Sequence, residues 1–478
     1  MVTGGRPLNG SVKIPAAKNS VLPLFAASLL CMGEVRLQAV PRLVDVEHCM
    51  ALLRGVGCAA RWEGSDAVLS GPPANSTLPG QTAGQMRASI LFCAPLLARL
   101  GRAETSLPGG CRIGARPIDL HLAGLAKMGA VELEAGEGRL VLTAPSGLHG
   151  AEITLRFPSV GATETLLLAA ACARGRTILR GAAREPEIAD LAAFLNRCGG
   201  CIEGAGSSTI RIEGRRGLSG CCFSPLPDRI FASTLACGCA AAGGRVELTG
   251  CAPALYAPVL EILGQMGCRV EPAGDTVRIS RFGRLHGAGR VFTGAYPALA
   301  TDAAPLLAAA MLCADSESSI EDVIFERRFG CAEGFCRLGA QAEAAGRVLT
   351  IAPGGLLRGT VVDAPDLRGG AALVLAGLAA RGTTVITHPA HIDRGYAGFT
   401  EILAGLGAQI RRESAPGNGT GKKPLQKNKF VLQSGQKDDT IQLYKYSIEL
   451  FLCEKRRFTI TYPMEDKSYG THARRRNG

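Results

Sequence analysis

The chain has 478 residues, of which 47% are hydrophobic and 20% charged, and its formal net charge is +12. This composition is typical of a globular protein with two or more domains. No apolar run approaches the roughly 18 residues that span a bilayer, and the first residues lack the pattern of a secretory signal. We therefore expect a cytoplasmic protein without a membrane span, whose 18 cysteines are free thiols rather than a disulfide framework.

A short phrase recurs six times along the chain: an apolar residue or Cys, then Gly, then Ala, Cys or Gly. The intervals between the central glycines are 68 to 72 residues. In each unit an apolar helical stretch ends at the glycine, as at a helix C-cap, and a strand-like run follows. One period throughout predicts six α/β (α+β) units, which can form a ring, a solenoid or two groups of three. The glycines are Gly57, Gly129, Gly199, Gly267, Gly339 and Gly407.

Polar and charged residues gather just before the predicted helical stretches. Helix N-termini and arginines both bind anions, so nine such segments favour a site for a phosphate or carboxylate. The alternative is that each segment is an ordinary N-cap on a solvated face. The segments are residues 16–24, 85–92, 110–120, 158–168, 226–233, 296–307, 325–330, 366–375 and 391–399.

The segment "LPGGCRIGARPIDLHL", residues 107–122, places a thiol among cations. The Pro and Gly residues before Cys111 predict a loop, and Pro117 suits the first position of a helix. Arg112 and Arg116 flank the thiol. Nearby cations and a helix N-terminus stabilise a thiolate and bind anions, which favours a functional cysteine over a buried small hydrophobe.

The composition changes near Arg412. The first 420 residues contain three lysines, whereas residues 421–478 contain eight lysines, five arginines and six acidic residues. We expect the folded body to end near Arg412 and residues 413–478 to form a linker and a basic tail of unknown structure. A solvated tail is favoured over a nucleic-acid contact, so no nucleic-acid partner is expected.

Neither a metal nor a cofactor is expected. The "CGGC" at residues 198–201 has the spacing of a zinc ligand pair, but no second pair follows at matching spacing. The "GNGTGKK" at residues 417–423 is one residue short of a phosphate-binding loop and lacks the Ser or Thr after its first Lys.

Nine motifs, in order from about residue 4 to residue 412, make the chain resemble the UDP-N-acetylglucosamine 1-carboxyvinyltransferases, a family of enolpyruvyl transferases. The resemblance implies two similar domains, each of three repeated units with helices inside and sheets outside. It places one domain at 18–226, the other at 1–17 and 227–412, and the active site in the cleft between them. The motifs are AAKNSVLP, MRASI, PGGCRIGARPIDLHL, PSVGAT, AAREPEI, LPDRI, TDAAP, DLR and HIDRGY.

The reaction that the resemblance implies is the transfer of enolpyruvate from phosphoenolpyruvate to the 3′-hydroxyl of UDP-N-acetylglucosamine, with release of phosphate. This reaction opens peptidoglycan precursor synthesis. The donor carries a phosphate and a carboxylate, and therefore needs several cations. Addition followed by elimination needs an acid for the methylene carbon and a base for the sugar hydroxyl.

Catalytic roles are likewise implied by the resemblance. Cys111 fits the reactive cysteine, a proton donor on a loop that closes over the substrates. Asp302 fits the carboxylate beside the sugar hydroxyl. The alternative is a purely structural role, in which Asp302 caps the N-terminus of a helix. Lys18 and Asn19 fit the pair that contacts phosphoenolpyruvate, and Arg394 completes the expected catalytic set of Cys111, Asp302, Lys18 and Arg394.

The other implied substrate contacts form two groups. Arg116, Arg368 and Arg394 fit the arginines that bind the phosphate and the carboxylate. Most of the rest fit contacts to the nucleotide sugar, with Ile324 and Phe325 supplying backbone and packing contacts. These further substrate contacts are Arg87, Pro117, Ile118, Asp119, Leu120, Ser159, Val160, Gly161, Ile324, Phe325, Arg328 and Asp366.

Two other functions remain possible at this point. A shikimate-pathway enolpyruvyl transferase has a related fold and the same donor, but it does not use a cysteine loop of this kind. A catalytically lapsed relative with a binding role is the second alternative, and intact Lys18, Cys111, Asp302 and Arg394 argue against it.

Overall fold

The computed structural model describes residues 1–107, 113–114, 117–136 and 138–413. Met1–Glu413 form one compact unit. The predicted basic tail lies outside the described residues. Across the described ranges, every helix is too short or too polar to cross a bilayer.

Six small sheets carry the strands of the described residues, and five of them share one strand order. In β9-β10-β12-β11, the first two strands are parallel and the last two form an antiparallel hairpin against β10. The sheets β13-β3-β5-β4, β2-β14-β16-β15, β17-β18-β20-β19 and β21-β22-β1-β23 repeat this order, and β6-β8-β7 lacks only the first strand. The strands are Val2–Thr3 (β1), Leu8–Lys13 (β2), Val35–Leu37 (β3), Ala59–Glu63 (β4), Asp66–Ser70 (β5), Arg102–Ser106 (β6), Val131–Gly136 (β7), Arg139–Thr143 (β8), Glu152–Thr154 (β9), Arg176–Arg180 (β10), Cys201–Glu203 (β11), Thr209–Glu213 (β12), Cys222–Phe223 (β13), Gly244–Thr249 (β14), Arg269–Ala273 (β15), Thr276–Arg281 (β16), Gly289–Phe292 (β17), Ser318–Glu321 (β18), Gln341–Ala345 (β19), Val348–Ala352 (β20), Val361–Asp363 (β21), Thr383–Thr387 (β22) and Gln409–Ile410 (β23).

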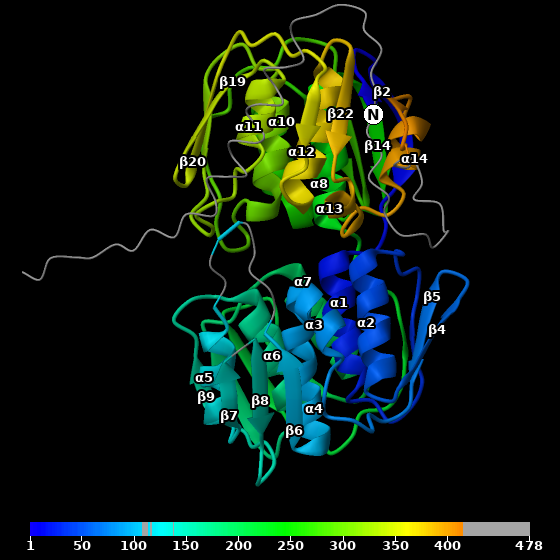
Figure 1. Ribbon diagram of the computed structural model, residues 1–478, viewed down its shortest axis with the longest axis vertical. Coiled ribbons are helices and arrows are strands. Elements are labelled where there is room, and N and C mark those ends of the chain that lie inside the picture. The colour runs from blue at the N-terminus through cyan, green and yellow to red at the C-terminus, as the bar shows by residue number, and fades with distance from the viewer. Residues whose placement is uncertain (108–112, 115–116, 137, 414–478) are drawn as a thin grey trace, which may run out of the picture. The chain divides into compact units, whose positions relative to one another are not determined.

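The central helices are apolar on all sides because they are buried on all sides. Helices α8, α10 and α12 pack pairwise on one another (Figure 1), and α1, α6 and η1 do the same in the other half. The helices are Lys18–Ser28 (α1), Val44–Gly55 (α2), Gly80–Gln85 (α3), Arg87–Phe92 (η1), Cys93–Leu100 (α4), Asp119–Lys127 (α5), Val160–Ala171 (α6), Pro186–Arg197 (α7), Arg229–Ala242 (α8), Pro253–Tyr256 (η2), Ala257–Gln265 (α9), Thr301–Ala303 (η3), Ala304–Met311 (α10), Ala332–Arg337 (α11), Leu367–Ala379 (α12), Ala390–Asp393 (α13) and Phe399–Gly405 (α14).

The six repeated glycines end six helices, as the sequence predicts. Each lies two residues beyond its helix, after α2, α5, α7, α9, α11 and α14. Their φ angles lie between 93° and 102°, in the region that glycine adopts without the cost paid by other residues. The predicted α/β body of six units is therefore confirmed.

The N-terminal strand completes the sixth unit. Strand β1 pairs antiparallel with β22 and β23, with Val2 opposite Thr384 and Ile410. It occupies the place that the second hairpin strand holds in the other sheets. The two ends of the described chain thus meet in one sheet.

The buried apolar residues form two separate clusters. One runs from Val21 to Leu218, and the other joins Val2, Leu8 and Ile14 to residues 230–408. The chain passes between the clusters twice, and the two passages pair: the Ala17 amide donates to the Leu226 carbonyl at 2.7 Å, and the Asp228 amide to the Pro15 carbonyl at 2.8 Å. The exact domain bounds stay a prediction.

Candidate active site

Lys18, Asp45 and Arg394 form one charged group, here called the Asp45 cluster. The ammonium of Lys18 lies 2.6 Å from Asp45 Oδ2, and Arg394 Nε lies 3.0 Å from Asp45 Oδ1. Burial alone would raise the pKa of Asp45, but the two cations outweigh it and hold the pKa below the usual value. Burial lowers the pKa of Lys18, which Asp45 opposes. One carboxylate thus holds two predicted site cations that are far apart in the sequence.

Asp302, Arg328 and Arg368 form a second group, the Asp302 cluster. Asp302 Oδ1 accepts from Arg328 Nη2 at 2.6 Å, and Oδ2 accepts from Arg368 Nε at 3.1 Å. Burial alone would raise the pKa of Asp302, but the charges of Arg368 and Arg328 hold it well below its usual range. The side chain of Asp302 keeps 29% of its surface exposed, so a substrate can reach this ionised carboxylate.

Arg368 has one donor to spare at the start of α12. Its Nη1 atom is buried and has no hydrogen-bond partner of ordinary geometry among the described residues, and the guanidinium lies 5.2 Å from the centre of the Tyr396 ring. The carboxylate of Asp366 caps the same helix, accepting from the amides of Arg368 and Gly369 at 2.9 and 3.0 Å. A buried donor without a partner is costly, and an anionic ligand oxygen would satisfy it.

The first turn of α1 presents Lys18 and Asn19. Ala17 provides no side-chain cap to this helix, and the Lys18 amide donates to Asp228 Oδ2 at 3.3 Å. Asn19 is exposed. Because the N-terminus of a helix attracts anions, this turn suits a phosphate or carboxylate group.

Two helix N-termini bring together the residues expected to bind a nucleotide sugar. Ser159 caps α6, with its hydroxyl accepting from the Ala162 amide at 3.4 Å, so Val160 and Gly161 form the first turn. Helix α5 packs against α6 and begins at Asp119, whose carboxylate pairs with Arg156.

The segment before α5 lies between Arg87 and that helix. Arg87 Nη2 donates to the Pro117 carbonyl at 3.2 Å. Pro117 is exposed, whereas Ile118 and Leu120 are half-buried. The structure therefore brings most of the predicted nucleotide-sugar residues of this half into one region.

The 322–327 segment is held by its own aspartate. The amides of Ile324 and Phe325 donate to Asp322 Oδ1 at 2.8 and 2.9 Å. These two N–H groups are thus already paired within the segment. Next to them, the Arg327 amide donates to the Ile113 carbonyl at 3.0 Å, which joins this segment to the end of the cysteine loop.

Two predicted site residues, Cys111 and Arg116, lie outside the described residues. Sequence reasoning also missed two carboxylates that hold site residues, Asp45 and Asp228. Asp45 shares a helix face with Cys49 and Leu52, both fully buried. An aspartate on the apolar face of a predicted helix was the available signal, since a buried carboxylate needs a partner.

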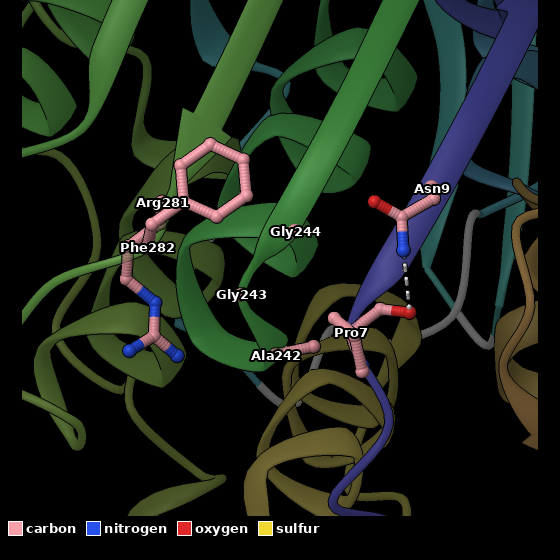
Figure 2. Close-up of a pocket in the computed structure, with 7 residues that line it drawn as sticks. All are labelled: Pro7, Asn9, Ala242, Gly243, Gly244, Arg281 and Phe282. Atoms are coloured by element: carbon pink, nitrogen blue, oxygen red, sulfur yellow. Dashed lines mark hydrogen bonds between the residues drawn. The ribbon is translucent and has the colours of Figure 1, made fainter.

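A surface hollow of about 500 Å³ is lined by residues in or next to β2, β14 and β16 (Figure 2). Asn9 donates to the Pro7 carbonyl at its edge. Arg281 is the single ionisable group among the seven residues drawn, and no predicted site residue is one of them. The seven are Pro7, Asn9, Ala242, Gly243, Gly244, Arg281 and Phe282.

The chain matches a known family and its members over most of its length. The family model described as EPSP synthase (3-phosphoshikimate 1-carboxyvinyltransferase) matches residues 2–403. A UDP-N-acetylglucosamine 1-carboxyvinyltransferase from Finegoldia magna is 42% identical over 409 residues, covering 85% of this chain and 96% of the relative. One from Solidesulfovibrio magneticus is 44% identical over 417 residues, covering 86% and 99%.

Solved structures show the same fold. The enolpyruvyl transferase NikO from Streptomyces tendae superposes with a TM-score of 0.77 at 26% identity, over 87% of this chain and 98% of that one. EPSP synthase from Acinetobacter baumannii superposes with a TM-score of 0.67 at 19% identity, over 86% and 99%. The fold predicted from the resemblance is thus confirmed, and the chain belongs to the enolpyruvyl transferases, in the family of the UDP-N-acetylglucosamine 1-carboxyvinyltransferases.

Proposed function

We propose that the chain transfers enolpyruvate from phosphoenolpyruvate to the 3′-hydroxyl of UDP-N-acetylglucosamine and releases phosphate. The observation that carries the proposal is the Asp302 cluster, in which a carboxylate reachable by solvent lies beside an arginine with an unpaired buried donor. The names of relatives 42% and 44% identical over most of the chain support it. This transferase step would open peptidoglycan precursor synthesis in the cytoplasm.

In this proposal, phosphoenolpyruvate binds to cations from both halves of the chain. Lys18, Arg368 and Arg394, together with Arg116, neutralise its phosphate and carboxylate, and Asn19 contacts it. An ammonium has three donors, and Asp45 occupies one of those of Lys18. Arg368 Nη1, which has no hydrogen-bond partner of ordinary geometry among the described residues, is proposed to take a ligand oxygen.

The nucleotide sugar is proposed to lie against the N-termini of α5 and α6. Both helix ends favour a diphosphate, and Arg87 lies beside them. The further proposed contacts are Arg116, Pro117, Ile118, Asp119, Leu120, Ser159, Val160, Gly161, Asp302, Ile324, Phe325, Arg328 and Asp366.

The reaction follows as addition and then elimination. Asp302 accepts the proton of the 3′-hydroxyl while the sugar oxygen attacks C2 of phosphoenolpyruvate, and Cys111 gives a proton to the methylene carbon. The tetrahedral intermediate then loses a proton from that carbon, the double bond re-forms and phosphate leaves. The cations that bind the phosphate stabilise its charge as it departs.

We also propose two domains, residues 18–226 and residues 1–17 with 227–412, with the site in the cleft between them. The two separate apolar clusters and the paired passages at Ala17 and Leu226 support this division. The Asp45 cluster joins the two halves of the chain, since Asp45 belongs to one half and Arg394 to the other.

The test is phosphate release by the full chain from phosphoenolpyruvate with UDP-N-acetylglucosamine, with shikimate 3-phosphate, and with neither. We expect release only with the nucleotide sugar, and its loss in Cys111→Ala. Cys222→Ala, which changes an exposed cysteine on β13, is the matched control and should keep full activity. Release with shikimate 3-phosphate would favour the shikimate-pathway alternative. No release from a folded chain would favour a lapsed relative.

A further inference from the structure

One buried carboxylate joins both passages of the chain between the two apolar clusters. Asp190, on α7, accepts with Oδ2 from the Ser20 hydroxyl and, at 3.2 Å, from the Leu226 amide. Ser20 lies just after the first passage and Leu226 in the second. Asp190 and Ser20 are 6% and 1% exposed, so water does not replace these hydrogen bonds.

The first turn of α1, which presents Lys18 and Asn19, belongs to the same hydrogen-bond network. The Ser20 amide donates to the Ala17 carbonyl at 3.1 Å, and the Ala17 amide donates to the Leu226 carbonyl at 2.7 Å. Ala17 has no side chain with which to cap α1. The contacts of Ser20 with Asp190 therefore fix the rotation of the first turn of α1 against the second passage.

We propose that Asp190 and Ser20 are positioning residues that aim Lys18 and Asn19 at phosphoenolpyruvate. Neither residue belongs to the proposed substrate contacts, and Asp190 acts through Ser20. The inference rests on the proposed function, because it assigns the first turn of α1 to that donor. Contacts to the nucleotide sugar come from other elements, mainly α5 and α6, so the two substrates should respond differently.

The experiment compares Ser20→Ala, Asp190→Ala and Asp190→Asn in the full chain by steady-state kinetics for each substrate. Loss of one buried hydrogen bond corresponds to roughly a tenfold effect. Ser20→Ala and Asp190→Ala should therefore raise KM for phosphoenolpyruvate about tenfold and leave KM for UDP-N-acetylglucosamine within about twofold. Asp190→Asn should restore KM, because the amide oxygen can accept both hydrogen bonds.

The matched control lies at the other end of the same helix. The Ser28 hydroxyl donates to the Phe25 carbonyl at 2.7 Å within α1, so Ser28→Ala removes a similar bond and should leave both KM values unchanged. The double variant Ser20→Ala with Asp190→Ala should be no worse than Asp190→Ala alone, since Asp190→Ala already removes the contact with Ser20 together with that of the Leu226 amide. Thermal unfolding of each variant checks that it is folded.

Three results would overturn the inference: equal effects on both substrates, an effect of Ser28→Ala as large as that of Ser20→Ala, or additive single variants. If the unmodified chain released no phosphate, the proposed function would fail separately. The same variants would then be compared by calorimetric binding of phosphoenolpyruvate. Unchanged affinity in Ser20→Ala, or no binding by the unmodified chain, would also overturn the positioning role.

Discussion

Replacing Asp190 by Asn should make the protein more stable at neutral pH and should remove part of its pH dependence. Burial raises the pKa of Asp190 from 3.8 to about 6, and the hydrogen bonds from Ser20 and Leu226 only partly oppose this. A rise of about two units corresponds to about 3 kcal/mol of unfolding free energy. Because the folded state binds this proton more tightly, stability falls as pH rises from about 4 to about 6, and the full cost remains above that range.

The assay is urea unfolding of the full chain and of Asp190→Asn at about pH 4.5 and about pH 7.5. The Asn variant should gain up to about 3 kcal/mol at the higher pH and much less at the lower pH. Asp275→Asn, at an exposed aspartate in the turn between β15 and β16, should change neither value. The reasoning is refuted if Asp190→Asn is no more stable than the parent at neutral pH, or if its advantage is the same at both pH values.

Three further predictions concern the site and the repeated helix ends. Arg368→Lys should lower kcat for phosphate release by about 100-fold or more, because an ammonium cannot hold Asp302 and a ligand oxygen in one plane; activity within tenfold would contradict this. Asp45→Ala should cost about 3 kcal/mol in denaturant unfolding, since it leaves buried charge unpaired, and an unchanged midpoint would contradict it. Gly199→Ala should cost about 1 kcal/mol, because φ at this open position is +95°. Gly264→Ala, in open space near the end of α9, should be neutral or stabilising in the same unfolding assay, and equal effects would contradict the backbone argument.

The repeat could be predicted because it rests on a local backbone requirement. A residue that must adopt a left-handed conformation after a helix is best served by glycine, so six helix ends leave six glycines at a constant spacing. The order of strands in a sheet has no comparable local signal in the sequence. That β1 fills the place of a hairpin strand between β22 and β23 depends on pairing Val2 with Ile410, at the far end of the folded body.

The sequence names the cations of both charged clusters and Asp302 as candidate site residues, but it does not point to Asp45 or Asp190. Lys18, Arg368 and Arg394 stand in short motifs beside helix starts, where both the residue type and the position indicate an anion. Asp45 lies inside an ordinary helical stretch, and its partner Arg394 is 349 residues away. Asp190 is 170 residues from Ser20. Asp45 and Arg394 meet where the two halves pack, and Asp190 and Ser20 meet where two helices of one half pack. The order of residues in the chain does not reveal such tertiary contacts.

The Asp45 cluster and the Asp302 cluster have the same arrangement of charges. In each, one carboxylate lies between two cations and leaves an excess of one positive charge, so the two clusters together carry an excess of two. The carboxylates let the cations be held in a partly buried place before any ligand arrives, because unpaired buried charge is costly. The remaining positive charge attracts an anion. A substrate that carries both a phosphate and a carboxylate is the ligand best suited to neutralise two such positions at once.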